Sequence, residues 1–431
     1  MKLYQNLCVA AAALLGGALM ASASEPTAEN LKKASNYYAY PYTDAPAPAL
    51  TAAPAGYTPF HIEHYGRHGS RWHIGSAMYN RPIEILEIAE RNGKLTARGA
   101  ELLAELRATR EAAQGRDGEL TPLGARQHRG IARRMTQNFP TVFADTARVD
   151  ARSTVVIRCI LSMDNELQEL AKFNPQLRIT SDASRADMPY MNFTDTDTVA
   201  MQAADKAEPQ LKEFKKRHPV PNDFISKLVT DPKFAADSMN VNSLRYYLMR
   251  QLQNAQSHDD RKLAAPYDIF TDSALHAQWV VDNADWFVSM GNSALTDGLA
   301  AYSQRRLLKN FIESADTAVA YLTTGANLRF GHEVVVLPLV VLMELDSYGE
   351  EINDLEQVEA RWHNYEIFPM ASNVQIVFYR PDNAKDPVLV KVLLNEREVR
   401  LPFVADQSRA PYYNWNDVRA YYLRKLERVP M

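Results

Sequence analysis

One short segment of the chain combines the residue types that phosphoryl transfer requires. In residues 65–71, His68 stands between Arg67 and Arg71. Guanidinium forks match the oxygens of a phosphate group, and a neutral imidazole is a competent nucleophile. Gly69 follows the histidine and lets the backbone approach a ligand closely. The segment predicts a site that binds phosphate between two arginines and accepts the phosphoryl group on His68.

Two later segments carry residues that could complete such a site. Arg158 lies in the first turn of a helix expected over residues 156–173, directly after a short expected strand. His332 and Glu333 stand at the start of another expected helix, after a strand that ends at Phe330. Helix N-termini favour anions through exposed N–H groups and the helix dipole. We expect the arginines and His332 to hold phosphate oxygens, and Glu333 to protonate the leaving oxygen.

The elements that must position these segments alternate between strands and helices at both ends of the chain. Period-two and period-3.6 patterns of apolar residues separate the two kinds of element. The expected strands are residues 60–65, 147–153, 177–180, 326–330, 374–379 and 388–394, and the expected helices are 75–92, 102–113, one opened by Thr121 and Pro122, 156–173, 334–343 and 414–428. This order predicts an α/β fold with an open, mostly parallel sheet flanked by helices. In such a fold the ligand lies beyond the carboxyl ends of the strands.

Between residues 187 and 316 the strand signals disappear and helical periodicity dominates. Val241, Leu244 and Leu248, for example, share one helical face. A chain of 431 residues is expected to form two domains, or one domain with a large insertion. We therefore expect an all-helical insertion, a cap, over 187–316, between the two parts of the α/β core, 24–186 and 317–431.

The first 23 residues have the pattern of a secretory signal peptide. Lys2 gives a positive start, residues 9–20 are apolar, and Ala-Ser-Ala at 21–23 is a cleavage site. The alternative is a membrane anchor, but the apolar run is shorter than the roughly 20 residues that a span needs. We expect cleavage after residue 23, export to the periplasm or the medium, and no stable membrane insertion. The mature chain then has one cysteine, Cys159, and no intramolecular disulfide.

Composition and the remaining histidines limit the classes of partner. With 46% hydrophobic and 23% charged residues, the chain resembles an ordinary soluble globule. A net charge of -4 gives no indication of nucleic-acid binding. His61, His64 and His73 lie close to His68 in sequence, but on a strand His61 and His64 face opposite sides, and no Cys or Asp completes a tetrahedral set. No metal or other cofactor is expected. The basic run 212–217 is expected to be a solvated helix face, or alternatively a rim that attracts polyanions.

Taken together, the three segments resemble the histidine acid phosphatase family, in the branch of periplasmic acid phosphatases, phytases and multiple inositol polyphosphate phosphatases. The first family motif, R-H-G-x-R, is matched at 67–71. The second, R-S-T and then R-T-x-x-S, is similar to residues 152–154 and 158–162. The third is a late His-Asp or His-Ala-Glu, where this chain has His332 directly before Glu333. The resemblance covers nearly the whole mature chain in element order, including the helical insertion.

This resemblance implies a role for each residue. His68 would attack phosphorus and become phosphohistidine, and Glu333 would protonate the leaving alcohol, without a metal. The phosphate oxygens would be held by Arg67, Arg71, Arg158 and His332. The sequence departs from the family at His73, where a proline is usual, and at Cys159, where threonine is frequent. Glu333 is longer than the usual Asp by one methylene, so the position of the donor stays open.

The implied activity is that of an exported phosphomonoester hydrolase with a small phosphorylated substrate. Inositol polyphosphates, phytate included, are the expected substrates on the strength of that branch. One alternative is a broad-specificity acid phosphatase for sugar phosphates or nucleotides. Another is a non-catalytic phosphate-binding protein on the same scaffold. Phosphoglycerate mutases share R-H-G but usually lack a signal peptide and a His-Glu pair. The sequence does not indicate an oligomeric state.

Overall fold

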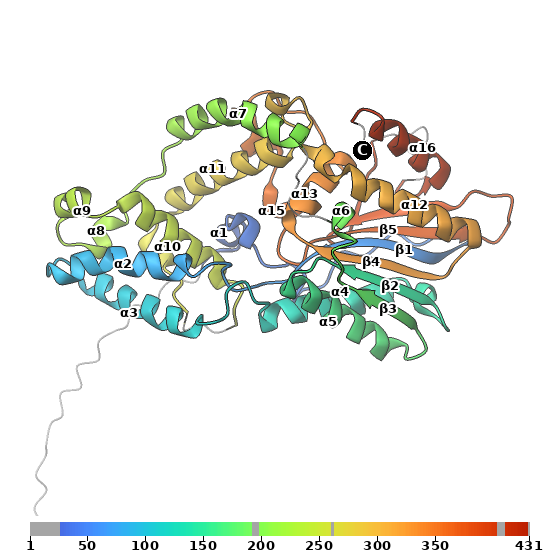
Figure 1. The fold of residues 1–431 in the computed structure, drawn as a ribbon, viewed down its shortest axis with the longest axis horizontal. Coiled ribbons are helices and arrows are strands. Elements are labelled where there is room, and N and C mark those ends of the chain that lie inside the picture. Colours follow the sequence, from blue (N-terminus) through green and yellow to red (C-terminus); the bar gives the residue numbers. More distant parts are fainter. Residues whose placement is uncertain (1–25, 192–197, 260–262, 403–409, 430–431) are drawn as a thin grey trace, which may run out of the picture.

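The computed structural model describes residues 26–191, 198–259, 263–402 and 410–429, and the expected signal peptide lies outside them. Figure 1 shows two regions: a sheet with helices on both faces, and a lobe of helices beyond one end of the strands. The expected α/β fold with an open sheet flanked by helices is confirmed. Every strand predicted from the sequence is present, and the structure adds two short ones, β7 and β8.

Within the described residues, the sheet has eight strands in the order β3-β2-β4-β1-β5-β6-β7, with β8 paired to β6. The four strands β3, β2, β4 and β1 run parallel, and β5 to β8 extend the sheet through antiparallel pairs. The bounds are β1 Tyr57–Arg67, β2 Arg148–Ser153, β3 Arg178–Asp182, β4 Gly325–Gly331, β5 Asn373–Pro381, β6 Leu389–Leu394, β7 Arg397–Val399 and β8 Tyr413–Asn414. The predicted strand pair near the C-terminus is the β5–β6 hairpin.

Strand register brings the three sequence segments to the same edge. Arg67, the last residue of β1, pairs with Gly331, the last residue of β4. On the other side of β4, Ser153 at the end of β2 pairs with Phe330. Because these three strands are parallel neighbours, the segments that follow them begin side by side. His68, Thr154 and His332 are therefore adjacent although far apart in the sequence.

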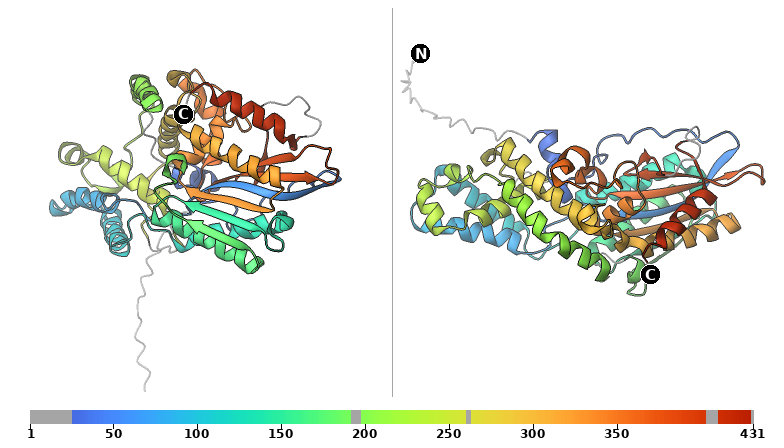
Figure 2. Two further views of the ribbon diagram at one scale, coloured as in Figure 1. Left: turned by 45° about the vertical axis from the view of Figure 1, so that its right-hand side comes forward. Right: turned by 90° about the horizontal axis from the view of Figure 1, so that it is seen from above.

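Helices cover both faces of the sheet. On one face lie α4 (Pro122–Asn138) and α5 (Ile157–Phe173), whose Ile131, Met135 and Leu170 pack with sheet residues in one apolar cluster. The predicted start of α4 is confirmed, since the Thr121 hydroxyl accepts a hydrogen bond from the Gly124 N–H and Pro122 opens the helix. Figure 2 shows α12 (Arg305–Tyr321), α13 (Glu333–Leu342) and α16 (Trp415–Leu426) on the opposite face.

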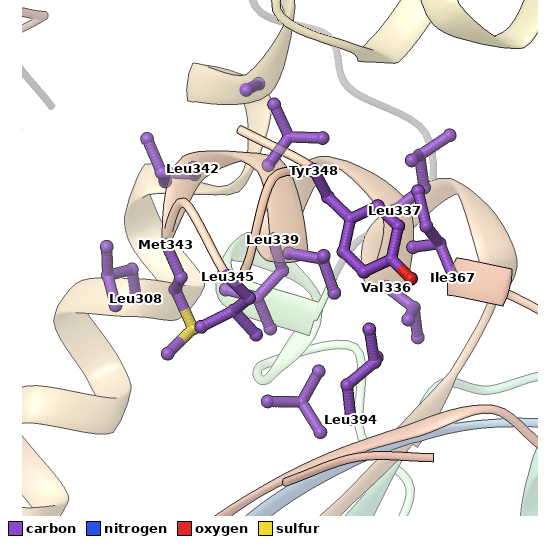
Figure 3. Close-up of a cluster of buried hydrophobic side chains, with 14 of the residues drawn as sticks. Leu308, Val336, Leu337, Leu339, Leu342, Met343, Leu345, Tyr348, Ile367 and Leu394 are labelled. Carbon is purple, nitrogen blue, oxygen red and sulfur yellow. The ribbon is translucent and has the colours of Figure 1, made fainter. Parts of the chain in front are cut away.

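The apolar run after Glu333 forms the buried helix α13. In Figure 3 its Leu339, and Met343 directly after the helix, lie between Leu308 of α12 and Leu394 of the sheet. Pro338 lies within this helix. Burial on all sides fixes the first residue of the helix, Glu333, relative to the strands. In the described part of the chain, no helix combines the length and the apolar character that a membrane span requires.

The lobe beyond the strands is helical, as the pattern of residues 187–316 predicts. Its helices within that span are α7 Thr198–Arg217, α8 Ile225–Leu228, α9 Pro232–Ser238, α10 Val241–Ala255 and α11 Asp272–Met290. The short helix α6 (Met188–Met191), in contrast, lies against β4 and α12 beside the sheet. Two helices from the earlier part of the chain, α2 (Ala77–Arg91) and α3 (Ala97–Ala112), pack into the same apolar cluster as α8 and α10. The cap therefore draws on two stretches of sequence, and the domain boundaries at 187 and 316 stay a prediction.

The remaining helices are short. They are α1 Ala28–Lys32, α14 Val358–Arg361 and α15 Asn364–Ile367, with short 3₁₀ helices at Ser35–Tyr37, Pro140–Phe143, Tyr267–Ile269, Ala294–Thr296, Ala300–Gln304 and Leu355–Gln357. In Figure 1, α1 lies between the cap helices and the sheet. The first described residues thus lie at the junction of the two regions, at the edge of the molecule in the right-hand view of Figure 2.

Candidate active site

His68 directly follows β1 and is held by its backbone on two sides. Its N–H donates to the Gly331 carbonyl (2.9 Å), and its carbonyl accepts from the Ala371 N–H (3.0 Å). The side-chain Nδ1 lies 2.9 Å from the Gly69 carbonyl. A carbonyl oxygen only accepts, so Nδ1 carries the ring proton. This leaves the lone pair on Nε2, which is buried and has no hydrogen-bond partner among the described residues.

The surroundings of His68 keep its ring neutral. Burial is the main cause of a pKa well below the ordinary value of 6.5, and the charges of Arg158 and Arg67 lower the pKa further. His332 and Arg71 act in the same direction. The neutral form is the nucleophilic form, and it persists in weakly acidic solution because protonation requires a pH below the depressed pKa. The site thus provides a nucleophilic nitrogen next to three guanidinium groups.

Arg67 is anchored more firmly than the sequence suggests. Its Nη1 donates to the Phe368 carbonyl (2.7 Å) and its Nη2 to the Asn36 carbonyl (2.8 Å), while its Nε lies 3.1 Å from Oε2 of Glu333. The side chain is fully buried, and burial lowers the pKa of Arg67 to about 10. The guanidinium stays charged at physiological and acidic pH.

Arg71 and Arg158 provide the other two guanidinium groups. Arg71 is 2% exposed, donates from Nη1 to the Trp72 carbonyl (3.1 Å), and stacks on the ring of Tyr37 at 5.2 Å from the ring centre. Burial lowers the pKa of Arg158 from its ordinary value. The Nε atoms of both arginines are buried without a hydrogen-bond partner in the described residues. Unused donors of this kind can bind the oxygens of an anion.

His332 lies beside His68, with ring centres 5.5 Å apart and the rings nearly perpendicular. Its Nε2 is 3.3 Å from the Thr154 hydroxyl and 3.5 Å from Sγ of Cys159. Burial, together with the charges of nearby arginines, lowers the pKa of His332 to about 3. Burial also raises the pKa of the Cys159 thiol to about 12, and the thiol donates to the Gly331 carbonyl (3.2 Å). Cys159 is a buried, protonated packing residue.

Glu333 is the first residue of α13 and points toward His68. Its Oε2 lies 3.1 Å from Nε of Arg67 and 3.7 Å from Nε2 of His68. Burial alone would raise the pKa of this carboxyl, but Arg67, Arg71 and His332 lower it to about 2. The contact with Arg67 is a close ion pair without hydrogen-bond alignment. In the free protein Glu333 is therefore ionised, and it must gain a proton before it can act as an acid.

Neighbouring helices hold the loop after His68. The Gly69 N–H donates to the hydroxyl of Ser162 (3.1 Å), and the Ser70 N–H donates to the side-chain carbonyl of Gln127 (2.8 Å). A Cβ on Gly69 would lie 2.5 Å from the carbonyl oxygen of Gly124. Gly69 is thus required for packing against α4, which differs from the expected approach to a ligand. The serine of the second motif, Ser162, serves to hold the first.

The structure brings all six predicted site residues together, and it places the other candidates elsewhere. Arg152 pairs with Asp150 (3.1 Å) and is not part of the site. In the basic run, Lys215 pairs with Asp285 and Arg217 with Glu356, which favours the solvated helix face. Five residues that contact the site were not predicted from the sequence to do so: Asn36, Tyr37, Gln127, Thr154 and Ser162. Only the last two lie in segments similar to family motifs.

Three of the site residues could in principle bind a cation. Ligand atoms of His68, His332 and Glu333 lie within 4.8 Å of one another, the one such group among the described residues. The same space contains the guanidinium groups of Arg67 and Arg71, which lower the pKa of Glu333. Positive charges this close oppose binding of a divalent ion. The charge arrangement suits an anion better than a metal.

We accordingly expect chelation to leave activity unchanged. Phosphate release would be measured before and after dialysis against EDTA, because the guanidinium groups supply the positive charge that a metal would otherwise provide. Dialysis without EDTA provides the control. Loss of activity that returns on addition of zinc or another divalent ion would contradict this prediction and support a metal at His68, His332 and Glu333.

Comparison with known proteins agrees with the geometry. The profile of the histidine phosphatase superfamily, branch 2, matches residues 67–395. Multiple inositol polyphosphate phosphatase 1 of Gallus gallus is 21% identical over 402 residues, which are 89% of this chain and 85% of that protein. The described fold superposes on the Bifidobacterium longum multiple inositol polyphosphate phosphatase in complex with inositol hexasulfate, with a TM-score of 0.70, 18% identity and coverage of 91% of this chain and 97% of that chain.

A second solved structure has the same fold. The phytase from D. castellii gives a TM-score of 0.64 at 15% identity and covers 94% of this chain and 88% of that chain. At such identities the superpositions establish the fold alone. The family profile, in contrast, spans most of the chain, from the first motif arginine to the β6–β7 turn. The chain is a phosphatase that belongs to the histidine phosphatase superfamily, branch 2.

Proposed function

We propose that the protein is an exported phosphomonoester hydrolase that acts on inositol polyphosphates, phytate included, through a phosphohistidine at Nε2 of His68. One observation carries the mechanism. Nε2 is the unprotonated, unpartnered nitrogen of a buried neutral imidazole, and three guanidinium groups lie beside it. Phosphoryl transfer depends on positioning and charge stabilisation, which these groups supply.

The first step forms a bond between Nε2 of His68 and phosphorus and breaks the bond between phosphorus and the ester oxygen. The arginines and His332 hold the three remaining oxygens, and Glu333 transfers a proton to the leaving oxygen. The proton on Nδ1 stays in its hydrogen bond to the Gly69 carbonyl, which stabilises the positive ring of the phosphohistidine. Water then attacks phosphorus, Glu333 accepts its proton, and the bond to Nε2 breaks.

The protonation state of Glu333 has to change on binding. With a pKa of about 2 it is ionised in the free protein. A bound phosphate engages Arg67 and Arg71 and adds negative charge close to the carboxylate. Both effects raise the pKa of Glu333, because the charged form loses its partners and gains a repulsive neighbour. The substrate itself thus converts Glu333 into an acid, and a phosphate monoanion can supply the proton.

The proposed substrate class rests on the relatives. Two of those above are named as multiple inositol polyphosphate phosphatases and one as a phytase. The proposal of export rests on the signal-peptide pattern of residues 1–23, which lie outside the described residues. N-terminal sequencing of the protein recovered after expression of the full chain would test export, with a start at Ser24 as the expected result.

A specific surface feature supports the broad-specificity alternative. Ile74 is 57% exposed, and Ile157, which directly precedes Arg158 in the chain, is 69% exposed. A Cβ on Gly118 would lie 3.3 Å from Nη1 of Arg158 and 3.6 Å from Cα of Ile74, so the two side chains share this edge of the site. Val155, close by in the chain, is also exposed. Apolar groups at this edge suit a weakly charged leaving group better than a highly phosphorylated ring.

One comparison of substrates separates these functions. The value of kcat/KM would be measured for inositol hexakisphosphate, a sugar phosphate and p-nitrophenyl phosphate. We expect the inositol polyphosphate to be preferred. Comparable values on all three would favour the broad acid phosphatase. Binding of inorganic phosphate without hydrolysis of any ester would indicate a phosphate-binding protein and overturn the proposed function.

A further inference from the structure

The N-terminal strap, defined here as residues 26–40, supplies contacts to both arginines of the first motif. The carbonyl of Asn36 accepts a hydrogen bond from Nη2 of Arg67 (2.8 Å). The next residue, Tyr37, places its ring against the guanidinium of Arg71, 5.2 Å from the ring centre. We propose that two residues of the strap, Asn36 and Tyr37, belong to the phosphate site and that Tyr37 is a positioning residue for Arg71. This inference rests on the proposed function and extends it to a segment outside the motifs.

On the core side, two hydrogen bonds fix the strap. The side-chain amide of Asn364 donates to the Ser35 hydroxyl (2.7 Å), and the Met370 N–H donates to the Tyr38 carbonyl (2.7 Å). Met370 is two residues beyond Phe368, whose carbonyl accepts from Nη1 of Arg67. The strap and the segment around Phe368 therefore hold the Arg67 guanidinium together. The strap accepts a hydrogen bond from Nη2, and Phe368 accepts one from Nη1.

On the cap side, the strap contacts α10 and α11. The Ala39 N–H donates to Oε1 of Gln256, directly after α10, and Nε2 of Gln256 donates to the Leu31 carbonyl (2.8 and 3.2 Å). The side-chain amide of Asn30 donates to Asp272 at the start of α11 (2.8 Å). In the right-hand view of Figure 2, α1, which is part of the strap, lies at the upper edge between the cap helices and the sheet. A single segment thus ties both regions together at the phosphate site.

The Tyr37 ring is itself held in place. It is 8% exposed and makes an edge contact with the ring of His73, 5.4 Å between ring centres. Its remaining surface lines a cavity of about 340 Å³ with Tyr246, Arg250 and Trp286. The surrounding residues therefore do not fill the space beside Arg71 if the ring is removed. Nε of Arg71 has no hydrogen-bond partner among the described residues, so apart from the Tyr37 ring the guanidinium is held by the Nη1 bond to the Trp72 carbonyl (3.1 Å) and by the charge of Glu333.

A positioning role gives a distinct kinetic signature. Tyr37 is not in contact with Nε2 of His68 or with Glu333 in any hydrogen bond or ion pair of the described residues, so the chemical step should change little. Arg71 would be free to adopt orientations that do not bind phosphate, which weakens binding of substrate and product alike. For Tyr37→Leu we expect KM for p-nitrophenyl phosphate and Ki for inorganic phosphate to rise about tenfold, the effect of losing one favourable contact to a cation. The value of kcat should change much less.

Three further variants make the experiment decisive. Tyr37→Phe keeps the ring and should bind phosphate like the wild type. Tyr37→Met removes the ring but keeps a longer, unbranched side chain that can adapt to the space, and it replaces Tyr37→Leu if that variant does not fold. Tyr38→Leu is the matched control, because the neighbouring ring contacts Tyr365 and not the site (6.4 Å between centres). Thermal unfolding of each variant would confirm that the fold is intact.

The outcomes separate this inference from the proposed function. If folded Tyr37→Leu or Tyr37→Met keeps wild-type KM and Ki, or if Tyr38→Leu shows the same loss, Tyr37 does not position Arg71. If Tyr37→Phe is as weak as Tyr37→Leu, the hydroxyl is responsible and the stacking argument is wrong. Affinity for inorganic phosphate, measured by calorimetry, tests the strap even if the wild type hydrolyses none of the esters. In that case the proposed function fails, but the phosphate affinities of the Tyr37 variants still support or overturn the positioning role of Tyr37.

Discussion

Replacement of His68 by alanine is expected to abolish turnover while phosphate binding is retained. Nε2 of His68 is the one unpartnered nucleophilic nitrogen between the motif arginines, and alanine removes it without changing Arg67 or Arg71. Removing the nucleophile of an enzyme whose residues act as a unit costs up to roughly 10⁶ in kcat, so a loss of at least about 10⁴-fold is expected. The rate would be measured on p-nitrophenyl phosphate and on inositol hexakisphosphate.

Binding and labelling experiments distinguish loss of chemistry from loss of structure. Inorganic phosphate should still raise the thermal unfolding temperature of His68→Ala, because a ligand that binds only the folded state stabilises it. Rapid quenching of the wild type with a radiolabelled ester should trap phosphate on Nε2 rather than Nδ1, since Nδ1 is bonded to the Gly69 carbonyl. His218→Ala, which alters a surface pair with Glu356, is the control. More than a few per cent residual activity in His68→Ala, or a label elsewhere, would exclude the phosphohistidine mechanism.

The sequence was most informative where local pattern and strand ends coincide. The Thr121-Pro122 start of α4 follows from capping chemistry, which needs only neighbouring residues. The apolar run after Glu333 had to be buried, since nothing else accommodates so many adjacent aliphatic side chains. The three site segments could be placed together because each follows a strand, and parallel strands end at one edge. Local rules and one general property of α/β sheets were sufficient for these features.

The packing of the cap and the order of the strands could not be predicted, because the apolar pattern of a segment does not specify which other segment it contacts. The pattern over residues 75–92 predicts a helix with an apolar face, but not that this face joins a core in the cap with Leu228 and Leu248. The position of β4 between β2 and β1 likewise follows from packing of the whole chain. An amphipathic helix carries the same signal whichever apolar surface it contacts. The contribution of α2 and α3 to the cap could therefore be found only in the structure.

The same limit explains which site contacts were missed. Gln127 holds the loop through one side-chain oxygen, and Asn36 contacts Arg67 through a backbone carbonyl that any residue could provide. A backbone contact leaves no trace in residue type. The pKa of Glu333 shows a related limit, because the effect of the helix start could be expected, but the size of the shift comes from Arg67 and Arg71 in three dimensions.

Glu333→Gln should affect poor leaving groups most, and this is the second large effect that we expect. An alkyl alcohol leaves badly without a proton, whereas p-nitrophenolate needs little assistance. General acid catalysis is typically worth about 10²–10⁴-fold, so losses of that size are expected on inositol or sugar phosphates. The loss in phosphorylation by p-nitrophenyl phosphate should be much smaller. The first step would be followed as a pre-steady-state burst, because Glu333 also serves the second step as a base.

The position of Glu333 also allows a structural role, and this experiment distinguishes that role from proton donation. The carboxylate begins α13, next to the positive end of the helix, and pairs with Arg67, so a purely structural role is physically reasonable. In that case glutamine would disturb the phosphate site for every ester, and the burst would slow equally on both substrate types. Glu333→Asp separates the roles further, since it keeps an acid but shortens the side chain by one methylene. It should recover part of the rate on alkyl esters if Glu333 is the donor. Glu313→Gln on the exposed face of α12 is the control and should leave both bursts unchanged.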